Sequence, residues 1–268
     1  MKVDILNISK DKVGEINLPI QFEEDIREDL VKRAALAMQS NRKQRYGAMP
    51  EAGKRSSSTI SKRRRKYRGS YGLGISRTPR KILSRRGARM FWVGAFSPNT
   101  VGGRRAHPPK SEKKLQKKIN KKERKKALRV GISATVIRDL VKSRGHMIPE
   151  NYPFVLDKNF ENLKKTKDVR EALKNFGFEN ELERVGKKNI RAGRGKARGR
   201  RYKIRKGPLI IVSKQSEVMK ATDNLLGIDI VNVKNLNIAM LAPGKVPGRL
   251  TLWTQGAIET LEKERLFR

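Results

Sequence analysis

The sequence predicts an α/β fold with a largely parallel sheet and helices on both faces, interrupted by a long and a shorter basic insertion. Two observations lead to this prediction. Short apolar segments typical of strands alternate along the chain with amphipathic segments of helical period, and this order favours parallel sheets covered by helices. Nearly all of the positive charge falls in segments that show neither period.

The first expected elements are a strand and two helices that flank the long insertion. Residues 2–8 begin with alternating apolar and polar side chains, and residues 23–39 place apolar side chains at helical spacing after three acids. Asn120 and Glu123 resemble a capping box at the start of the next helix. Apolar residues then repeat every four positions until Gly145, which can end that helix.

The second half of the chain repeats the alternation. A short strand is expected at 154–156, followed by a helix that Thr166 caps and Gly177 ends. The remaining expected strands are 209–212, 228–231 and 249–253, and the helical patterns are 217–222, a turn at 236–241, and 256–266. The predicted organisation is one globular domain, 1–268, with insertions at 46–110 and 187–206.

The charge is concentrated in three segments. The 268 residues contain 65 Lys and Arg against 26 Asp and Glu, a net charge of +39. Residues 42–110 carry +19, residues 111–129 carry +8 and residues 187–206 carry +11, so the rest of the chain is almost neutral. Like charges at this density repel one another unless a polyanion neutralises them. The predicted partner is nucleic acid, and no segment adds the long apolar face that a membrane surface requires.

Several other functions are excluded or disfavoured. Without Cys the chain has no disulfide, thiolate zinc site or thiol nucleophile, and its two His are too far apart in sequence for a familiar metal motif. The longest apolar runs have about four residues, whereas a membrane span needs roughly 20. An acid stands where a signal peptide would be apolar, so an intracellular protein is expected. No metal, cofactor or small-molecule substrate is predicted.

Catalytic motifs are missing as well. The sequence has no GxxxxGK[ST] or GxSxG pattern, and Gly72-Leu73-Gly74 is followed by Arg77 where a dinucleotide-binding loop needs Gly. Asp4, Asp157 and Asp229 lie near strand ends, but turn and capping roles explain them at least as well as catalysis. The chain is therefore not expected to be an enzyme.

The insertions have the composition of a nucleic-acid-binding surface. Arg grips phosphate with a planar fork, Gly lets the backbone approach its ligand, and Tyr stacks on unpaired bases. In the long insertion the predicted binding residues are Lys54, Arg55, Lys62, Arg63, Arg64, Arg65, Lys66, Tyr67, Arg68, Tyr71, Arg77, Arg80, Lys81, Arg85, Arg86, Arg89, Arg104, Arg105 and Lys110. In the second insertion they are Arg191, Arg194, Lys196, Arg198, Arg200, Arg201 and Lys203.

Some roles stay open at this point. A flexible linker at 187–206 is disfavoured because foldable sequence flanks it on both sides. Ten bases in 111–129 favour phosphate contact over a merely solvated helix face. Residues 91–93, Phe-Trp-Val, fit base stacking and anchoring of the loop equally well, and His107 is expected to pack between its neighbours rather than transfer protons.

Five segments in order along the chain closely resemble the archaeal branch of the large-subunit ribosomal protein L-four family. They are residues 105–110 (Arg-Ala-His-Pro-Pro-Lys), 120–124 (Asn-Lys-Lys-Glu-Arg), 190–200 (Ile-Arg-Ala-Gly-Arg-Gly-Lys-Ala-Arg-Gly-Arg), 241–244 (Leu-Ala-Pro-Gly) and 248–251 (Gly-Arg-Leu-Thr). The resemblance spans nearly the whole chain.

The resemblance implies a Rossmann-like domain on the outside of the large ribosomal subunit and a long loop that enters its 23S-type rRNA. The loop corresponds to about 46–110, with Arg85, Arg86, Arg89, Arg104 and Arg105 along its stem. Its tip would help line the polypeptide exit tunnel through Arg68, Gly69, Ser70, Tyr71 and Gly72. After Gly74 this chain departs from the family's usual Gly-x-Gly-Arg pattern.

The combined prediction is a structural, cytoplasmic rRNA-binding protein that also contacts neighbouring large-subunit proteins and supports subunit assembly. RNA is favoured over DNA because long irregular basic loops suit folded RNA, and no helix-turn-helix or zinc-finger pattern is present. Two other classes are weighed against it: an RNA-acting enzyme that uses the α/β body for catalysis, and a DNA-compacting protein.

Overall fold

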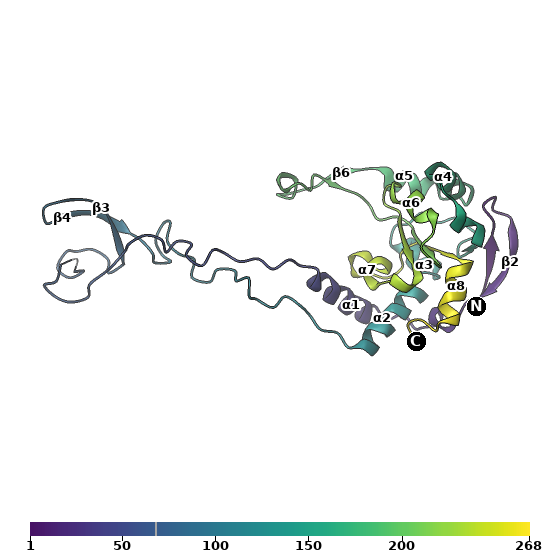
Figure 1. Cartoon of the computed structure of the whole chain (residues 1–268), viewed down its shortest axis with the longest axis horizontal. Coiled ribbons are helices and arrows are strands. Elements are labelled where there is room, and N and C mark those ends of the chain that lie inside the picture. The colour runs from purple at the N-terminus through teal and green to yellow at the C-terminus, as the bar shows by residue number, and fades with distance from the viewer. Residues whose placement is uncertain (68) are drawn as a thin grey trace. The chain divides into compact units, whose positions relative to one another are not determined.

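The computed structural model describes residues 1–67 and 69–268. Arg68, which belongs to both the predicted binding set and the predicted tip, lies outside the described residues. The chain divides into two compact units: unit 1 contains residues 1–42 and 116–268, and unit 2 contains residues 43–115. Figure 1 labels elements of both units where there is room.

A mainly parallel sheet forms the centre of unit 1, as the sequence predicts. In spatial order its described strands are β2 (Lys12–Asn17), β1 (Lys2–Leu6), β5 (Val155–Leu156), β10 (Thr251–Thr254), β8 (Leu209–Val212) and β9 (Asp229–Asn232). Neighbouring strands run parallel except for β1 and β2, which are antiparallel.

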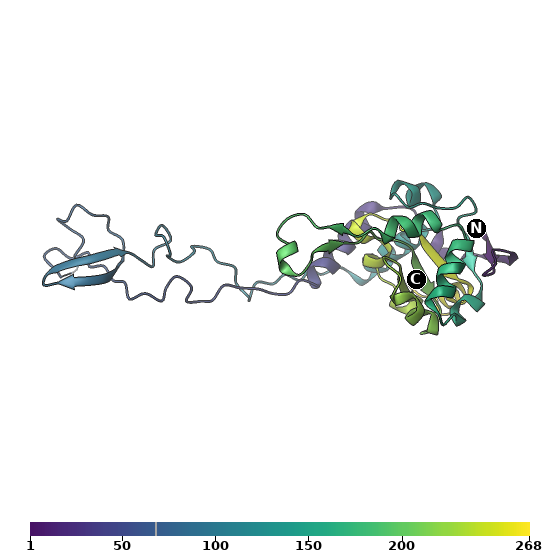
Figure 2. The ribbon, with the colours of Figure 1, turned by 90° about the horizontal axis from the view of Figure 1, so that it is seen from above.

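Helices cover both faces of this sheet. Residues alternate between two apolar cores along each strand, so that Leu209 and Ile211 of β8 face one core while Ile210 and Val212 face the other. The first core is covered by α1 (Glu28–Asn41), α2 (Lys121–Ser133), α7 (Ile238–Leu241) and α8 (Gln255–Lys263). The second is covered by α3 (Arg138–Ser143), α4 (Thr166–Asn175), α5 (Glu179–Gly186) and α6 (Glu217–Asp223). The fold class is therefore confirmed (Figures 1 and 2).

The expected helix between Asn120 and Gly145 is wrong in two respects. It is two helices, because α2 ends at Ser133 and α3 begins at Arg138. The capping box does not form either: Asn120 is the N-cap residue, but in the described structure its side chain accepts no cap hydrogen bond. Glu123 instead pairs with Arg33 of α1 at 3.1 Å, which joins the two helices that flank unit 2.

Other elements differ from the prediction at their ends. The first helix starts at Glu28 rather than at residue 23; a 3-10 turn at Ile20–Phe22 and five non-helical residues, 23–27, precede it. Thr166 is the first helical residue of α4, and Lys165 is the N-cap. The sequence patterns missed β2 and α5. The other 3-10 turns are Lys158–Asn162, Lys196–Arg198, Val233–Asn235 and Pro243–Lys245.

Both insertions contain paired strands that their weak periodicity did not predict. In unit 2, β3 (Arg80–Arg86) and β4 (Arg89–Gly94) form an antiparallel hairpin. In the second insertion, β6 (Asn189–Ile190) pairs with β7 (Tyr202–Lys203). No helix in the described part of the chain is long and apolar enough to cross a membrane.

A buried arginine ties the start of β10 to the end of the second insertion. The Arg249 side chain is fully buried, and it donates to the Gly207 carbonyl at 2.9 Å, the Met240 carbonyl at 3.0 Å and Asp229 Oδ2 at 2.7 Å. Burial lowers the pKa of Arg249, and the charge of Asp229 opposes this effect. Lys206, which is more exposed, contacts the same carboxylate at 2.8 Å.

We expect Arg249→Met to lower the free energy of unfolding by about 2–4 kcal/mol, because the Gly207 and Met240 carbonyls lose their donor and Asp229 keeps only its exposed partner Lys206. Lys206→Met is the matched control. It removes an exposed partner of the same carboxylate and should cost less than about 1 kcal/mol. Urea unfolding of the RNA-free protein measures both, and equal losses would contradict a special role for Arg249.

Candidate nucleic-acid interface

The predicted binding side chains lie on the surface with their charges unneutralised. All those that the structure describes are exposed, except for Arg80, Arg104 and Arg191, which are half-buried. Within the described ranges none of these Lys and Arg residues pairs with a carboxylate. In the charge-balanced part of unit 1, by contrast, Lys12 pairs with Asp4 at 2.7 Å. Among the described residues, the predicted binding bases of the insertions therefore have no carboxylate as counter-charge.

Aromatic rings hold several of these guanidinium groups in place. The Arg80 guanidinium lies 5.5 Å from the centre of the Trp92 ring and donates to the Ser76 carbonyl at 2.6 Å. Arg89 lies 5.3 Å from the centre of the Phe91 ring. Trp92 thus helps to hold the hairpin, whereas Phe91, which is 48% exposed, presents its ring at the surface. The anchoring role is therefore seen at Trp92, while base stacking by the exposed Phe91 ring stays a prediction.

The hairpin changes the placement of three arginines expected along the stem. Arg85, Arg86 and Arg89 surround the two-residue turn at Gly87 and Ala88. Gly87 has φ 57°, a left-handed conformation that suits a tight hairpin turn. These arginines therefore cluster at one end of the hairpin. Arg104 and Arg105 lie on the segment that returns toward residue 115.

The segment at 69–76 differs from its surroundings because it has no charged side chain. Ser70 is buried and its N–H donates to the Ser61 carbonyl at 3.2 Å, so it supports the loop from within. Leu73 is 57% exposed, and Tyr71 is also exposed with the Arg77 guanidinium 4.8 Å from its ring centre. An apolar, uncharged segment is therefore exposed between basic ones.

The second insertion is a short hairpin that one of its own arginines closes. Arg191 donates through Nε to the Arg200 carbonyl at 3.0 Å and through Nη2 to the Tyr202 carbonyl at 3.4 Å. Arg191 is therefore mainly a brace. Gly193 and Gly199 both have positive φ, and the bases between and after them are exposed. In Figure 1 the loop that carries β6 stands clear of the helices of unit 1.

A buried charge cluster braces the start and the end of this insertion, and the sequence patterns gave no indication of it. Glu181 of α5 accepts from Arg184 at 2.6 and 2.7 Å and lies 2.7 Å from Nδ1 of His146. Burial alone would raise the pKa of Glu181, but its bonds to Arg184, His146 and the Met147 N–H outweigh burial and lower it. Arg184 also donates to the Lys206 carbonyl at 2.8 Å.

The acids considered for catalysis have structural roles. Asp157 accepts from the Lys158 N–H at 2.7 Å and caps a 3-10 turn. Asp4 pairs with Lys12 at 2.7 Å, and Asp229 pairs with Arg249. The described residues contain no group of three or more acidic or histidine side chains placed to hold a metal ion.

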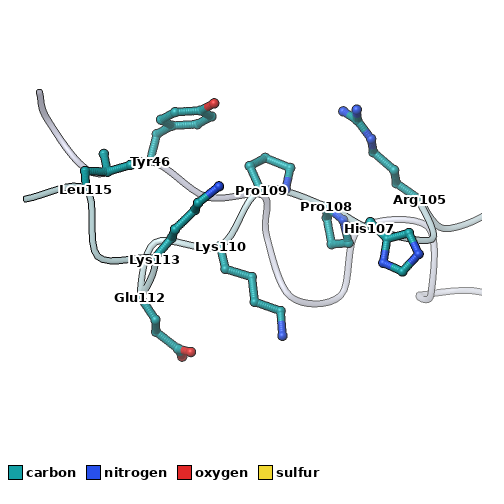
Figure 3. A pocket seen from close by; sticks show the side chains of 9 residues that line it. All are labelled: Tyr46, Arg105, His107, Pro108, Pro109, Lys110, Glu112, Lys113 and Leu115. Atoms are coloured by element: carbon teal, nitrogen blue, oxygen red, sulfur yellow. The ribbon is translucent and has the colours of Figure 1, made fainter. Parts of the chain in front are cut away.

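Unit 2 begins and ends with an extended segment: the outgoing arm, residues 43–55, and the returning arm, residues 104–115. A hollow of about 720 Å³ lies between these two arms (Figure 3). Tyr46 and Leu115 line it from the ends of the unit, together with Arg105, His107, Pro108, Pro109, Lys110, Glu112 and Lys113. His107 is exposed rather than packed between Ala106 and Pro108, so that expectation is wrong.

The fold and surface together define an α/β protein whose neutral body carries two exposed basic extensions. The family model described as the ribosomal protein L4/L1 family matches residues 16–264. The chain therefore belongs to the ribosomal protein L4/L1 family. It is a structural ribosomal protein rather than an enzyme.

Curated relatives agree with this assignment along the full length. The chain is similar to the large ribosomal subunit protein uL4 of Nanoarchaeum equitans, with 51% identity over 268 residues covering 100% of both chains. The corresponding protein of Archaeoglobus fulgidus is 45% identical, covering 97% of this chain and 98% of the relative. That of Methanospirillum hungatei is 43% identical, covering 99% and 100%. The resemblance to the archaeal branch is thereby confirmed.

Proposed function

We propose that this chain is a constituent of the large ribosomal subunit that binds large-subunit rRNA through its two insertions, 46–110 and 187–206. The observation that carries the proposal is the separation of charge. Segments with +38 of the net +39 contain only three acids, and the predicted binding bases within them have no ion-pair partner in the described structure. A folded RNA supplies phosphates at that density and along that length.

Binding is driven by release of the counterions that the phosphates hold, and by stacking of exposed rings on unpaired bases. Arg89 and Arg104 already lie against aromatic rings, at 5.3 and 5.8 Å from the ring centres, so less conformational freedom is lost when they meet phosphate. The insertions thus bridge RNA segments and support subunit assembly. Neighbouring large-subunit proteins meet the neutral surface of the single α/β domain.

The uncharged segment at 69–76 has a separate role. Bases flank it on both sides, but its own exposed side chains are Tyr71, Leu73 and Ile75. A surface without charged side chains binds phosphate weakly, and it is suited to forming the wall of an aqueous passage. Together with the family resemblance, this composition supports a role of the segment, and of Arg68, Gly69, Tyr71 and Gly72 within the predicted tip, in lining the polypeptide exit tunnel.

Co-sedimentation tests the proposal. We expect the tagged protein to co-sediment with large subunits at physiological salt, because many phosphate contacts at fixed positions hold it there. Release into the supernatant, or equal affinity for duplex DNA and large-subunit rRNA at moderate salt, would contradict it. The second outcome would favour a DNA-compacting protein.

A further inference from the structure

Specific backbone contacts hold the two arms of unit 2 close together beside the hollow. The Ala48 N–H donates to the Pro109 carbonyl at 2.9 Å. At Gly47 an added Cβ would lie only 2.5 Å from the Ser111 backbone nitrogen, so only glycine allows this approach. These two contacts place the neighbouring Tyr46 opposite the returning arm (Figure 3).

One side of the hollow combines flat apolar surface with cations. The Tyr46 side chain is 70% exposed, and Figure 3 shows its ring on the same side as Pro109. The Lys113 ammonium reaches between these two rings, and Arg105 points to the same side farther along the arm. The single acid of the hollow, Glu112, points to the opposite side together with Lys110 and His107.

This arrangement fits a single unstacked nucleotide. An exposed tyrosine ring stacks on the face of any base, while flanking cations bind the phosphates on either side of it. A base inside a duplex is already stacked on both faces and cannot meet the ring. The hollow, at about 720 Å³, lies within the range of about 300–1,000 Å³ typical of small-ligand sites.

We propose that Tyr46 binds an unpaired RNA base that is turned out of its helix, with Lys113 and Arg105 on the adjoining phosphates. The inference rests on the proposed function and adds a class of ligand to it: a bulged or looped-out nucleotide rather than duplex backbone. The base of the long insertion thereby fixes its position on the RNA through stacking as well as charge.

Binding of the full chain to deproteinised large-subunit rRNA tests this site. Tyr46→Leu should weaken binding by roughly five- to 150-fold, the range for loss of one base–aromatic stack, with no change in salt dependence. Tyr46→Phe keeps the ring and should stay within about twofold of the wild type. Lys113→Ala should instead lower the salt slope by roughly 0.7–0.9, as expected for one lost phosphate contact.

Val13→Ala, at an exposed apolar residue of β2 outside both insertions, is the control and should bind like the wild type. If Tyr46→Leu binds with wild-type affinity, the inference is overturned. It is also overturned if Tyr46→Phe loses as much affinity as Tyr46→Leu, since either result would show that the aromatic ring does not contribute to binding. These results would leave the proposed function intact. Failure of the wild-type protein to bind the rRNA with a steep salt dependence would overturn both.

Discussion

Replacing Lys54, Arg55, Arg105 and Lys110 by alanine should largely exclude the protein from assembled large subunits. All four side chains are exposed on the two arms of unit 2, and none has an ion-pair partner in the described structure. Four lost phosphate contacts lower the salt slope by about three units, which corresponds to roughly a hundredfold loss of affinity near 0.2 M salt. Occupancy is measured in subunits purified from cells that express tagged variants beside the wild-type protein.

Deletion of residues 71–76 is the matched comparison, since it removes the uncharged segment and keeps Ser70 on the Ser61 carbonyl. This variant should assemble nearly normally and alter the passage of nascent chains or the binding of small molecules in the tunnel. If the deletion abolishes incorporation while the four-alanine variant assembles normally, the assignment of arms and tip is reversed. The tunnel role would then be lost, while the argument from charge would remain.

The second insertion should contribute a comparable share of binding. Changing Arg194, Arg198, Arg200 and Arg201 to alanine should lower the salt slope by about three units, because these side chains are exposed and none has an ion-pair partner in the described structure. Fluorescence anisotropy with labelled large-subunit rRNA over a series of KCl concentrations measures the slope.

Arg191→Ala alone provides the control for this loop. Its guanidinium bonds to the carbonyls of Arg200 and Tyr202, so its loss should disturb the hairpin and weaken binding with a smaller change in slope than the fourfold substitution. An unchanged slope in the fourfold variant would mean that the second insertion faces solvent in the complex.

The sheet and its helices could be predicted because their signals are local. The four apolar residues of β8 and the helical spacing in α1 and α4 are each visible within a dozen positions. The prediction failed where long-range contacts decide the structure. Glu123 pairs with Arg33 instead of capping its own helix, a choice that depends on how α1 packs against α2.

The interface was predicted in composition but not in geometry. Charge density identified the segments that we propose to bind rRNA, since charge is a property of the sequence alone. The brace formed by Arg191 could not be separated from the freely exposed arginines around it, because all of them occur in the same Gly-Arg pattern. The Glu181 and His146 cluster was missed for a similar reason: its members are 35 residues apart in sequence.

The salt dependence of rRNA binding by the wild-type protein tests the central claim most directly. If the insertions act through their unpaired bases, the logarithm of affinity should fall with the logarithm of KCl concentration by at least about seven units, the slope for ten phosphate contacts. A slope of one or two units would mean that the exposed charge does not meet phosphate, and it would contradict the account of both insertions.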